Sequence, residues 1–335
     1  MSKTFKILSL DGGGIKGLYT AIILNIFETN HGRIVDHFDM ICGTSTGGLI
    51  ALCLAANIPT NDIVSFYRKY GPKIFPSDNV LIRAFNLIKQ IIICTKYNNA
   101  QLKAALVEKL GELVLDDAEI CLCIPAVNLS TCKGIVFKTS HASILTRDKS
   151  VKMLDVALAT SAAPTFFPIV DVPGISNRCI DGGLWANNPA FVGVMEALSY
   201  FVGDDKSYDD ISLLSIGGLS TQAGWPAWKF RRASMAMWNK SLITLTLDCQ
   251  SRATELIMDI AQAKQVLSFK NYVRINDPQL TKAQMKLITL DRSDKKALAE
   301  IEDIALAQGN MWKNKSEVVG FFQTKTKKWK FPICE

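Results

Sequence analysis

The sequence predicts an α/β fold built on a mainly parallel sheet. Two strand-like apolar runs near the amino terminus are each followed by a tight turn and a helix-like segment, the alternation typical of parallel sheets. The chain has 335 residues, of which 48% are hydrophobic and 21% charged. It can therefore bury a large core, and its composition is not that of a disordered protein.

The first two strand–turn–helix units lie in the first 56 residues. Residues 5–10 (FKILSL) predict a short buried strand and residues 18–29 a helix. Residues 36–42 predict the second strand, and residues 46–56 (TGGLIALCLAA) predict a helix that is buried on all sides. Ligands of such sheets bind at the carboxyl ends of the strands, so the turns at those ends are the segments of interest.

The rest of the chain predicts further strands and shorter helices. Asn188 is expected to cap a helix that begins at Pro189. From about residue 225 the sequence is more helical and more basic, which suggests a core, residues 1–220, and a helical extension packed on the same domain, residues 221–335. Strands are predicted at residues 119–127, 135–138, 177–181 and 211–216, and a short helix at residues 153–161.

The first glycine-rich turn, LDGGGIKGL, has two interpretations. Gly12, Gly14 and Gly17 have the G-x-G-x-x-G spacing of a dinucleotide-binding loop, and an acid that could bind the ribose follows at Asp36 or Asp39. The same N–H groups at the start of a helix could instead stabilise the negative charge of a transition state.

The second glycine turn, GTSTG, fits a nucleophile elbow. It has the G-x-S-x-G pattern between a predicted strand and a predicted helix, with Gly43 and Gly47 on either side of Ser45. A serine on so sharp a turn has a strained backbone, so its close neighbours must lack side chains, and the helix start favours negative charge. Ser45 is thus a candidate nucleophile, and a plain tight turn is the alternative.

A serine hydroxyl needs a base, and the sequence offers two kinds. His31 and His37 are expected at the far end of the sheet, whereas His141 lies in a polar loop and leaves a Ser-His-Asp triad open. Asp181 begins the third glycine turn, DGG, at the end of a predicted strand, where it can meet Ser45. Because a carboxylate has an ordinary pKa of about 3.9, it would need partial desolvation to act as a base.

The two glycine turns together favour acyl transfer over cofactor binding. A cofactor loop has no need of a serine elbow at the next strand end, and Asp11 would tend to repel a pyrophosphate. Acyl transfer needs a nucleophile and N–H donors, each of which contributes about 3 kcal/mol at such sites, and Lys16 could add positive charge. The alternative that stays open is a nucleotide-binding protein that uses the DGGGIKG loop without hydrolase activity.

The three turns resemble the motifs of the patatin-like phospholipases. That family is marked by a D-G-G-G-x-[RK]-G loop, a G-x-S-x-G elbow and a D-G-[GA] turn, which stand here in the same order at residues 11–17, 43–47 and 181–183. The likeness covers about residues 5–220 and includes FYRKYGPKIFP, ATSAAPTFFP and DGGLWANNPA. One departure is SIGGLS (215–220), where many relatives have a serine–leucine–glycine–threonine–glycine run.

The resemblance implies a three-layer α/β/α fold with a Ser–Asp dyad and no histidine base. It also implies an activity of the phospholipase A type, in which acyl esters of membrane phospholipids are cleaved through an acyl-serine intermediate without a metal. The residues concerned are Ser45 and Asp181 as the catalytic dyad, Gly12, Gly13, Gly14 and Lys16 at the oxyanion hole, and Gly43 and Gly47 at the elbow.

The compact size and the NYVRIND stretch (271–277) look like bacterial stand-alone members of the family. Some of these are effectors of anti-phage signalling, switched on by cyclic oligonucleotides, so the resemblance implies a cyclic dinucleotide activator. No residue can be matched to a nucleotide site. We expect no DNA or RNA partner, and the sequence leaves a homo-oligomer open.

Composition and patterning predict a cytoplasmic protein whose membrane contact is peripheral, and the resemblance implies that this contact is with the inner membrane face when the protein is active. No secretory signal and no apolar run of about 20 residues is visible. The nine cysteines include no C-x-x-C pair and read as reduced core residues, while the net charge of +7 is compatible with anionic lipid. Residues 80–95, 225–240 and the basic tail 325–331 could contact lipid, the alternatives being core-covering helices and a solvated terminus.

Overall fold

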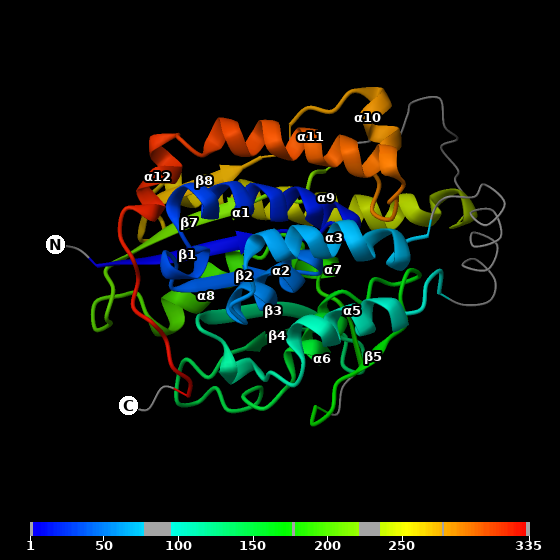
Figure 1. Cartoon of the computed structure of the whole chain (residues 1–335). Coiled ribbons are helices and arrows are strands. Elements are labelled where there is room, and N and C mark those ends of the chain that lie inside the picture. Colours follow the sequence, from blue (N-terminus) through cyan, green and yellow to red (C-terminus); the bar gives the residue numbers. More distant parts are fainter. Residues whose placement is uncertain (1–2, 77–94, 176–177, 221–234, 277, 333–335) are drawn as a thin grey trace.

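The computed structural model describes residues 3–76, 95–175, 178–220, 235–276 and 278–332, which form one sheet with helices on both faces (Figure 1). The order of the strands is β5-β6-β3-β2-β1-β7-β8, and β4 pairs with β3 beside this path. The strands are β1 (Thr4–Leu10), β2 (Met40–Gly43), β3 (Cys121–Asn128), β4 (Lys133–Lys138), β5 (Val170–Asp171), β6 (Arg178–Asp181), β7 (Asp210–Ile216) and β8 (Phe269–Ile275).

The prediction of a mainly parallel sheet is confirmed. The five strands β8, β7, β1, β2 and β3 run parallel to their neighbours, whereas β4 and β6 run antiparallel to β3, and β5 runs antiparallel to β6. The antiparallel strands lie toward the β5 edge of the sheet. The helices of the described residues are α1 (Gly17–His31), α2 (Thr46–Ala55), α3 (Thr60–Ile74), α5 (Ala100–Leu110), α6 (Met153–Thr160), α7 (Gly183–Ala186), α8 (Ala190–Tyr200), α9 (Met235–Ala263), α10 (Lys282–Leu287), α11 (Lys295–Trp312) and α12 (Ser316–Phe322).

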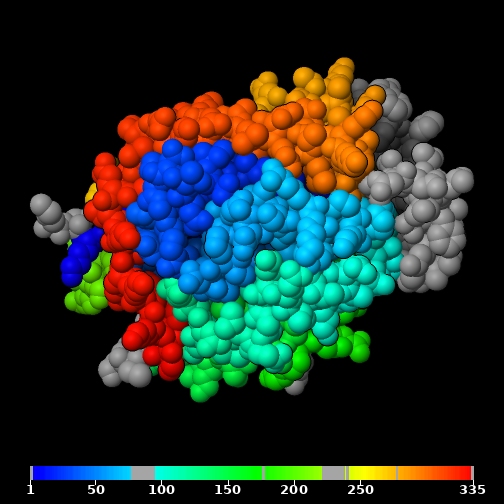
Figure 2. Space-filling model, viewed as in Figure 1, coloured from blue at the N-terminus to red at the C-terminus, as the bar shows by residue number. Residues whose placement is uncertain are grey.

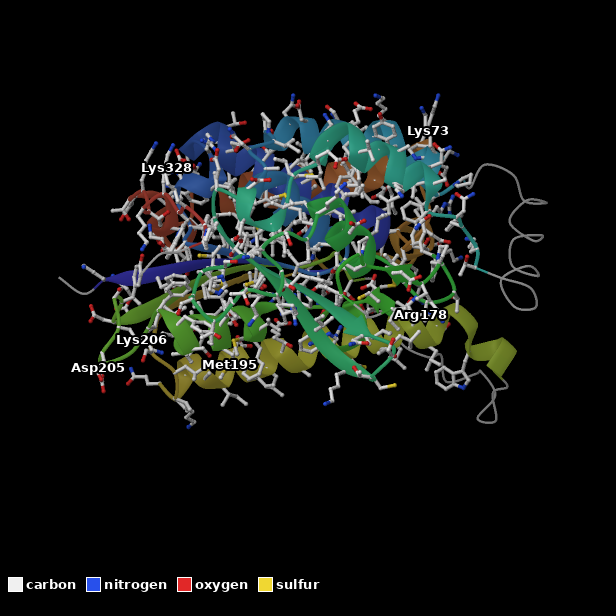
Figure 3. The ribbon with its side chains drawn as sticks, turned by 90° about the horizontal axis from the view of Figure 1, so that it is seen from below. Lys73, Arg178, Met195, Asp205, Lys206 and Lys328 are labelled. Carbon is white, nitrogen blue, oxygen red and sulfur yellow. The ribbon has the colours of Figure 1, made fainter. Side chains whose placement is uncertain are left out.

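The sheet has a hydrophobic core on each face, which produces three layers (Figure 3). Side chains alternate between the faces along β1, as the period of a strand requires. Leu8 and Leu10 pack in the larger core with α1, α2, α3 and α6, while Phe5 and Ile7 pack in the smaller core with α8 and with Met258 of α9. Strand β1 is buried on both faces, as expected of a strand in the interior of the sheet, where it lies between β2 and β7.

The amino-terminal half follows the prediction closely, apart from the start of the second strand. Residues 34–36 form a short 3-10 turn, and β2 begins only at Met40. Asp39 stands before it and bonds with Lys6 through both backbone and side chain, since its carboxylate accepts the Lys6 N–H at 2.9 Å. At α8, the helix begins at Ala190, one residue later than predicted, and Pro189 takes the N-cap position in place of Asn188. The Asn188 side chain still accepts the N–H of Ala190 at 3.0 Å, from the residue before the cap.

The chain beyond residue 220 contributes more than helices. Strand β8, which was not predicted, pairs in parallel with β7 and extends the sheet. On the face of the sheet that carries the larger core, α11 and α12 lie against α1, as the orange and red atoms beside the blue ones show in Figure 2. No helix of the described residues combines the length and the apolarity that a membrane crossing needs.

The basic tail is packed against the fold and is not a solvated terminus. Trp329 is buried in the smaller core, where its ring packs on Phe201 and Phe331. Thr326 donates its N–H to the carbonyl of Asp36, and Lys325 pairs with the Asp36 carboxylate. The solvated-terminus interpretation is therefore wrong, while lipid contact by the exposed lysines of this tail stays a prediction. Residues 80–94 and 225–234 of the other two lipid-contact candidates lie outside the described residues.

Candidate active site

The predicted elbow is a strained turn between β2 and α2. Ser45 has a positive φ of 53°, a conformation that L-residues adopt at a cost in energy. The turn passes so close to β1 that a Cβ atom on Gly47 would collide with the Leu10 carbonyl oxygen, and one on Gly43 would collide with Gly47 itself. The glycines are therefore required by close packing of the backbone, and the turn holds the Ser45 side chain at the carboxyl edge of the sheet.

The structure brings Ser45 and Asp181 into direct contact. The Ser45 hydroxyl donates a hydrogen bond of 2.7 Å to Oδ2 of Asp181, and the other carboxylate oxygen, Oδ1, accepts the Gly183 N–H at 2.7 Å. Both side chains are buried. Burial raises the pKa of Asp181 to about 6, although the hydrogen bonds from Gly183 and Ser45 favour the charged form. The carboxylate is thus more basic than an exposed aspartate and is still ionised at neutral pH.

Asp181 reaches Ser45 by a different route from the one that the sequence suggested. It was expected at the end of a parallel strand, but β6 runs antiparallel to β3. Strand β3 continues past the level where β2 ends, and β6 pairs with this projecting part, with Asp181 opposite Ala126. The strand therefore runs back toward the elbow from outside the parallel edge. The expected neighbour was right and the expected strand direction was wrong.

Thr160 fixes the backbone on both sides of the dyad, and sequence reasoning gave it no role. Its hydroxyl accepts the Ser45 N–H at 3.0 Å and donates to the Pro125 carbonyl at 2.6 Å. Its own carbonyl accepts the Gly182 N–H at 3.3 Å, next to Asp181. The available signal was the ATSAAPTFFP stretch, which begins one residue earlier and resembles the family.

The first glycine turn lies beside the elbow and its amides are largely engaged. Gly12 donates its N–H to the Asn187 carbonyl at 3.0 Å, and Gly13 donates to the Thr46 hydroxyl at 3.1 Å. Gly14 has a φ of 63° and packs so closely on the Leu290 carbonyl that a side chain would not fit. The oxyanion role of the three glycines stays a prediction. It would require the amides of Gly12 and Gly13 to exchange their present acceptors for the oxyanion.

Two charged residues at this turn face away from the dyad. The Lys16 ammonium is buried and donates to the Leu219 carbonyl at 2.9 Å. Asp11 forms a two-pronged ion pair with Arg274 of β8, at 2.8 and 2.6 Å, and Arg274 also donates to the Ser215 hydroxyl at 2.7 Å. Arg274 neutralises the Asp11 charge next to the glycines, a pairing across 263 positions that no local pattern could have indicated.

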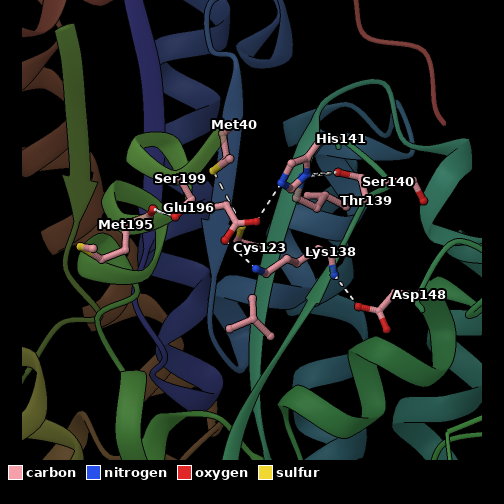
Figure 4. A network of polar contacts seen from close by, with 12 residues as sticks. Met40, Cys123, Lys138, Thr139, Ser140, His141, Asp148, Met195, Glu196 and Ser199 are labelled. Carbon is pink, nitrogen blue, oxygen red and sulfur yellow. Dashed lines mark hydrogen bonds and ion pairs between the residues drawn. The ribbon is translucent and has the colours of Figure 1, made fainter. Parts of the chain in front are cut away.

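The three histidines all have partners elsewhere. His141 points one ring nitrogen at Glu196, 2.9 Å away, and the other at the Thr139 hydroxyl, and Figure 4 shows it in this network with Lys138. His31 and His37 contact backbone carbonyls near α12. The Ser-His-Asp alternative is therefore wrong, because the Ser45 hydroxyl bonds to Asp181 and the His141 ring is held in the network with Glu196.

An apolar pocket opens beside the dyad. Ser45 and Asp181 lie on its wall with Gly13 and Gly14. The remainder is almost entirely apolar and comes from both halves of the chain, since α9 adds two side chains to those of α2, α3 and the 161–167 segment. The apolar side chains include Leu49, Phe66, Phe75, Phe166, Ile243 and Leu247. A wall of this kind suits a hydrocarbon chain whose ester carbonyl lies at the serine.

A three-layer α/β fold in which a serine elbow meets a desolvated carboxylate at the mouth of an apolar pocket defines the class of the acyl hydrolases. Within that class, the chain belongs to the patatin-like phospholipase family, whose model matches residues 8–194, more than half of the sequence. The protein is thus a hydrolase, and the family resemblance of the three glycine turns is confirmed.

Similar proteins occur in bacteria and eukaryotes. A cGAMP-activated phospholipase of Pseudomonas aeruginosa is 32% identical over 292 residues, which cover 86% of this chain and 83% of that protein. A protein of the same name from Vibrio cholerae is 30% identical over 347 residues, 97% and 96% of the two chains. Among solved structures, human GIVD cytosolic phospholipase A2 matches with a TM-score of 0.46 and 9% identity, over 96% of this chain and 60% of that one.

Proposed function

We propose that the protein hydrolyses acyl esters of membrane phospholipids, with Ser45 as the nucleophile and Asp181 as the general base. The observation that carries this assignment is the 2.7 Å hydrogen bond from the Ser45 hydroxyl to a buried carboxylate whose pKa is raised to about 6. The apolar pocket at the same point supports an acyl chain as the group that is transferred.

The reaction has two balanced halves. As Ser45 Oγ attacks the ester carbonyl carbon, its proton passes to Asp181, and the carbonyl electron pair moves onto oxygen. The ester C–O bond then breaks, the leaving alcohol takes the proton from Asp181, and an acyl-Ser45 and a lysophospholipid result. Water repeats the sequence on the acyl-serine, with Asp181 again taking and returning a proton, and releases the fatty acid.

The oxyanion of each half would be stabilised by amides of the first glycine turn. Gly13 and Gly14 line the pocket next to Ser45, which supports their place in this role. The Gly12 and Gly13 amides are occupied by Asn187 and Thr46, so the oxyanion would replace these acceptors. Such an exchange makes the turn a natural point of control over the rate.

A cyclic dinucleotide is the activator that we propose, and bacterial defence against phage is the accompanying role. Support comes from the relatives called cGAMP-activated phospholipases in Pseudomonas aeruginosa, Escherichia coli and Vibrio cholerae, which are 30–39% identical to this chain. Activation would convert a resting cytoplasmic enzyme into one that attacks the lipid of its own membrane. We propose that the reaction needs no metal, so that chelation should leave the activated rate unchanged.

The membrane contact that we propose lies on α9. Two of its side chains, Ile243 and Leu247, belong to the acyl pocket, while others on the helix are exposed to solvent although they are apolar. Exposed apolar side chains on the helix that also lines the pocket would let the enzyme rest on a bilayer. The exposed residues are Leu242, Leu245, Leu256, Ile257 and Ile260.

The direct test combines covalent labelling with lipid analysis. A fluorophosphonate should label wild-type protein at Ser45, and the label should be lost in Ser45→Ala and largely lost in Asp181→Asn. With cGAMP present, mass spectrometry of phospholipid vesicles should show free fatty acid and lysophospholipid for the wild type alone. Fatty acid release by Ser45→Ala at the wild-type rate would refute the assignment of the nucleophile.

A further inference from the structure

A second cavity, of about 290 Å³, lies on the other side of the first glycine turn from the acyl pocket. It is formed where β1, β7 and β8 end, the edge at which open α/β sheets bind their ligands. One face of α9 closes it with Asp248, Ser251, Arg252 and Glu255, whose spacing of three and four residues places them on the same side of the helix. We call this space the polar cavity.

The lining of the polar cavity combines charges of both signs with carboxamides. Lys16, Arg252 and Arg274 supply positive charge, and Asp11, Asp248 and Glu255 supply negative charge. Asn276 and Gln279 follow β8 and add side-chain amides that can both donate and accept hydrogen bonds. A simple anion needs only cations, whereas a nucleotide offers phosphates to the cations and base edges to amides and carboxylates.

Arg252 is the cation best placed for a phosphate. Arg274 is committed to Asp11, and the Lys16 ammonium donates to a backbone carbonyl. Arg252 is exposed on α9, and among the described residues no carboxylate forms an ion pair with it. Its planar guanidinium can donate two parallel hydrogen bonds to one phosphate.

Asn187 connects the polar cavity to the acyl pocket, because it lines both. Its carbonyl accepts the Gly12 N–H at 3.0 Å, and its side-chain amide donates to the Ser251 hydroxyl on α9 at 2.8 Å. The Oδ1 atom of Asn187 is buried and, within the described part of the chain, has no hydrogen-bond partner. A ligand that draws Ser251 or Asn187 toward it would therefore alter the acceptor that now holds the Gly12 amide.

We propose that the polar cavity binds the cyclic dinucleotide, and that the bound ligand changes the first glycine turn through Asn187. This inference rests on the proposed function. Arg252 binds a phosphate of the ligand, and Gln279 contacts a base. The bound ligand favours a position of Asn187 that frees the Gly12 amide, so the catalytic site is completed only when the polar cavity is filled.

The experiment measures cGAMP binding to the full-length chain by calorimetry, without lipid. Wild-type protein is compared with Arg252→Glu and Gln279→Ala, and with Lys264→Glu as a matched charge reversal at an exposed site just after α9. The two cavity variants should bind cGAMP about tenfold or more weakly, and Lys264→Glu as tightly as wild type. Vesicle hydrolysis should then need correspondingly more cGAMP. Thermal unfolding checks the fold, and Gln279→Ala carries the test if Arg252→Glu is unfolded.

Each part of the proposal can fail separately. If the wild type binds cGAMP and both cavity variants bind it equally well, the polar cavity is not the activator site, while the proposed activation stands. If those variants keep their cGAMP affinity but lose hydrolysis of phospholipid relative to p-nitrophenyl butyrate, the cavity serves the phosphate of the substrate and the inference is overturned. If the wild type itself neither binds nor responds to cGAMP, the proposed activation falls first, and this site with it.

Discussion

At the scale of single residues, the buried carboxyl group of Asp181 links the chemistry to the stability of the fold. Its pKa is about 6 in the folded protein against an ordinary 3.8. The folded state therefore binds this proton more tightly than the unfolded state does, and the free energy of unfolding falls as the pH rises from about 4 through 6. Asp181 therefore contributes least to the free energy of unfolding above about pH 6, which is the range where its carboxylate can act as a base.

Asp181→Asn should therefore unfold less readily than the wild type at neutral and alkaline pH. An amide at this site has no charge to desolvate, so at about pH 8 the gain in the free energy of unfolding should be up to roughly 3 kcal/mol. Urea unfolding at pH 8 and near pH 4 measures it, and the difference should shrink at the acid end. A variant less stable than wild type at pH 8 would contradict the raised pKa.

The same group should set the pH dependence of the rate. The hydroxyl proton of Ser45 can pass only to an ionised Asp181, so kcat/KM should rise with pH and level off above about 6. A soluble ester such as p-nitrophenyl butyrate reports this without an effect of pH on lipid vesicles. A profile that stays flat from about pH 4.5 to 8 would mean that another group takes the proton.

Thr160 is expected to hold the elbow in its productive position. Thr160→Val keeps the shape but removes the hydroxyl that bonds to Ser45 N and Pro125 O, so both buried groups lose a partner. We expect a loss of about 1–3 kcal/mol in stability and about a tenfold lower kcat. Ser199→Ala, on the exposed side of α8, removes a hydroxyl that donates to the Met195 carbonyl and should leave both quantities unchanged. Equal effects of the two variants would deny Thr160 a role in the site.

At the scale of elements, α9 has two functions, since it closes the acyl pocket and exposes apolar side chains. Leu256→Glu combined with Ile260→Glu should reduce vesicle binding and lower hydrolysis of vesicles about tenfold or more, because two charges would enter the lipid interface. Hydrolysis of a soluble ester should fall much less. Gln262→Glu, exposed on the same helix, is the control for an added negative charge. Unchanged vesicle binding would assign this face to another partner, such as a second copy of the chain.

Local patterns predicted most elements because their periods were clear. Strand β1 and the buried helix α2 have nearly unbroken apolar runs, and both lie where they were expected. Strand β8 was missed because its sequence, FKNYVRI, mixes polar and apolar residues at the edge of the sheet, where part of it is exposed. The antiparallel direction of β6 could not be read either, because a strand's pattern of side chains is the same in both directions.

At the scale of the whole molecule, the ion pair between Asp11 and Arg274 joins two distant parts of the chain, the turn after β1 and strand β8. Arg274→Met should cost about 3–5 kcal/mol of stability, since it removes the guanidinium that pairs with the buried Asp11 carboxylate. Activity should fall as well, because Asp11 directly precedes the glycine turn that lies beside the elbow. Asp11→Asn added to Arg274→Met should restore much of the stability. Chemical denaturation of the wild type, Arg274→Met, Asp11→Asn and the double variant gives the coupling energy of the pair. If the two losses of stability simply add, the residues do not stabilise the fold through their interaction.

The parts of the site that carry their own motif could be found in the sequence, and their supports could not. Ser45, Asp181 and the first glycine turn each have a local pattern that steric demands explain. Thr160 and Asn187 are ordinary residues whose value depends on what lies opposite them after folding. Long-range pairing leaves no trace in a single sequence, so the dyad was predictable and the scaffold that orients it was not.

The Leu290 carbonyl, against which the first glycine turn packs, comes from the last sixth of the polypeptide. The ribosome must therefore have passed residue 290 before the loop that begins at residue 11 can settle into its final shape. A fragment released early in translation would carry the serine and lack its finished surroundings.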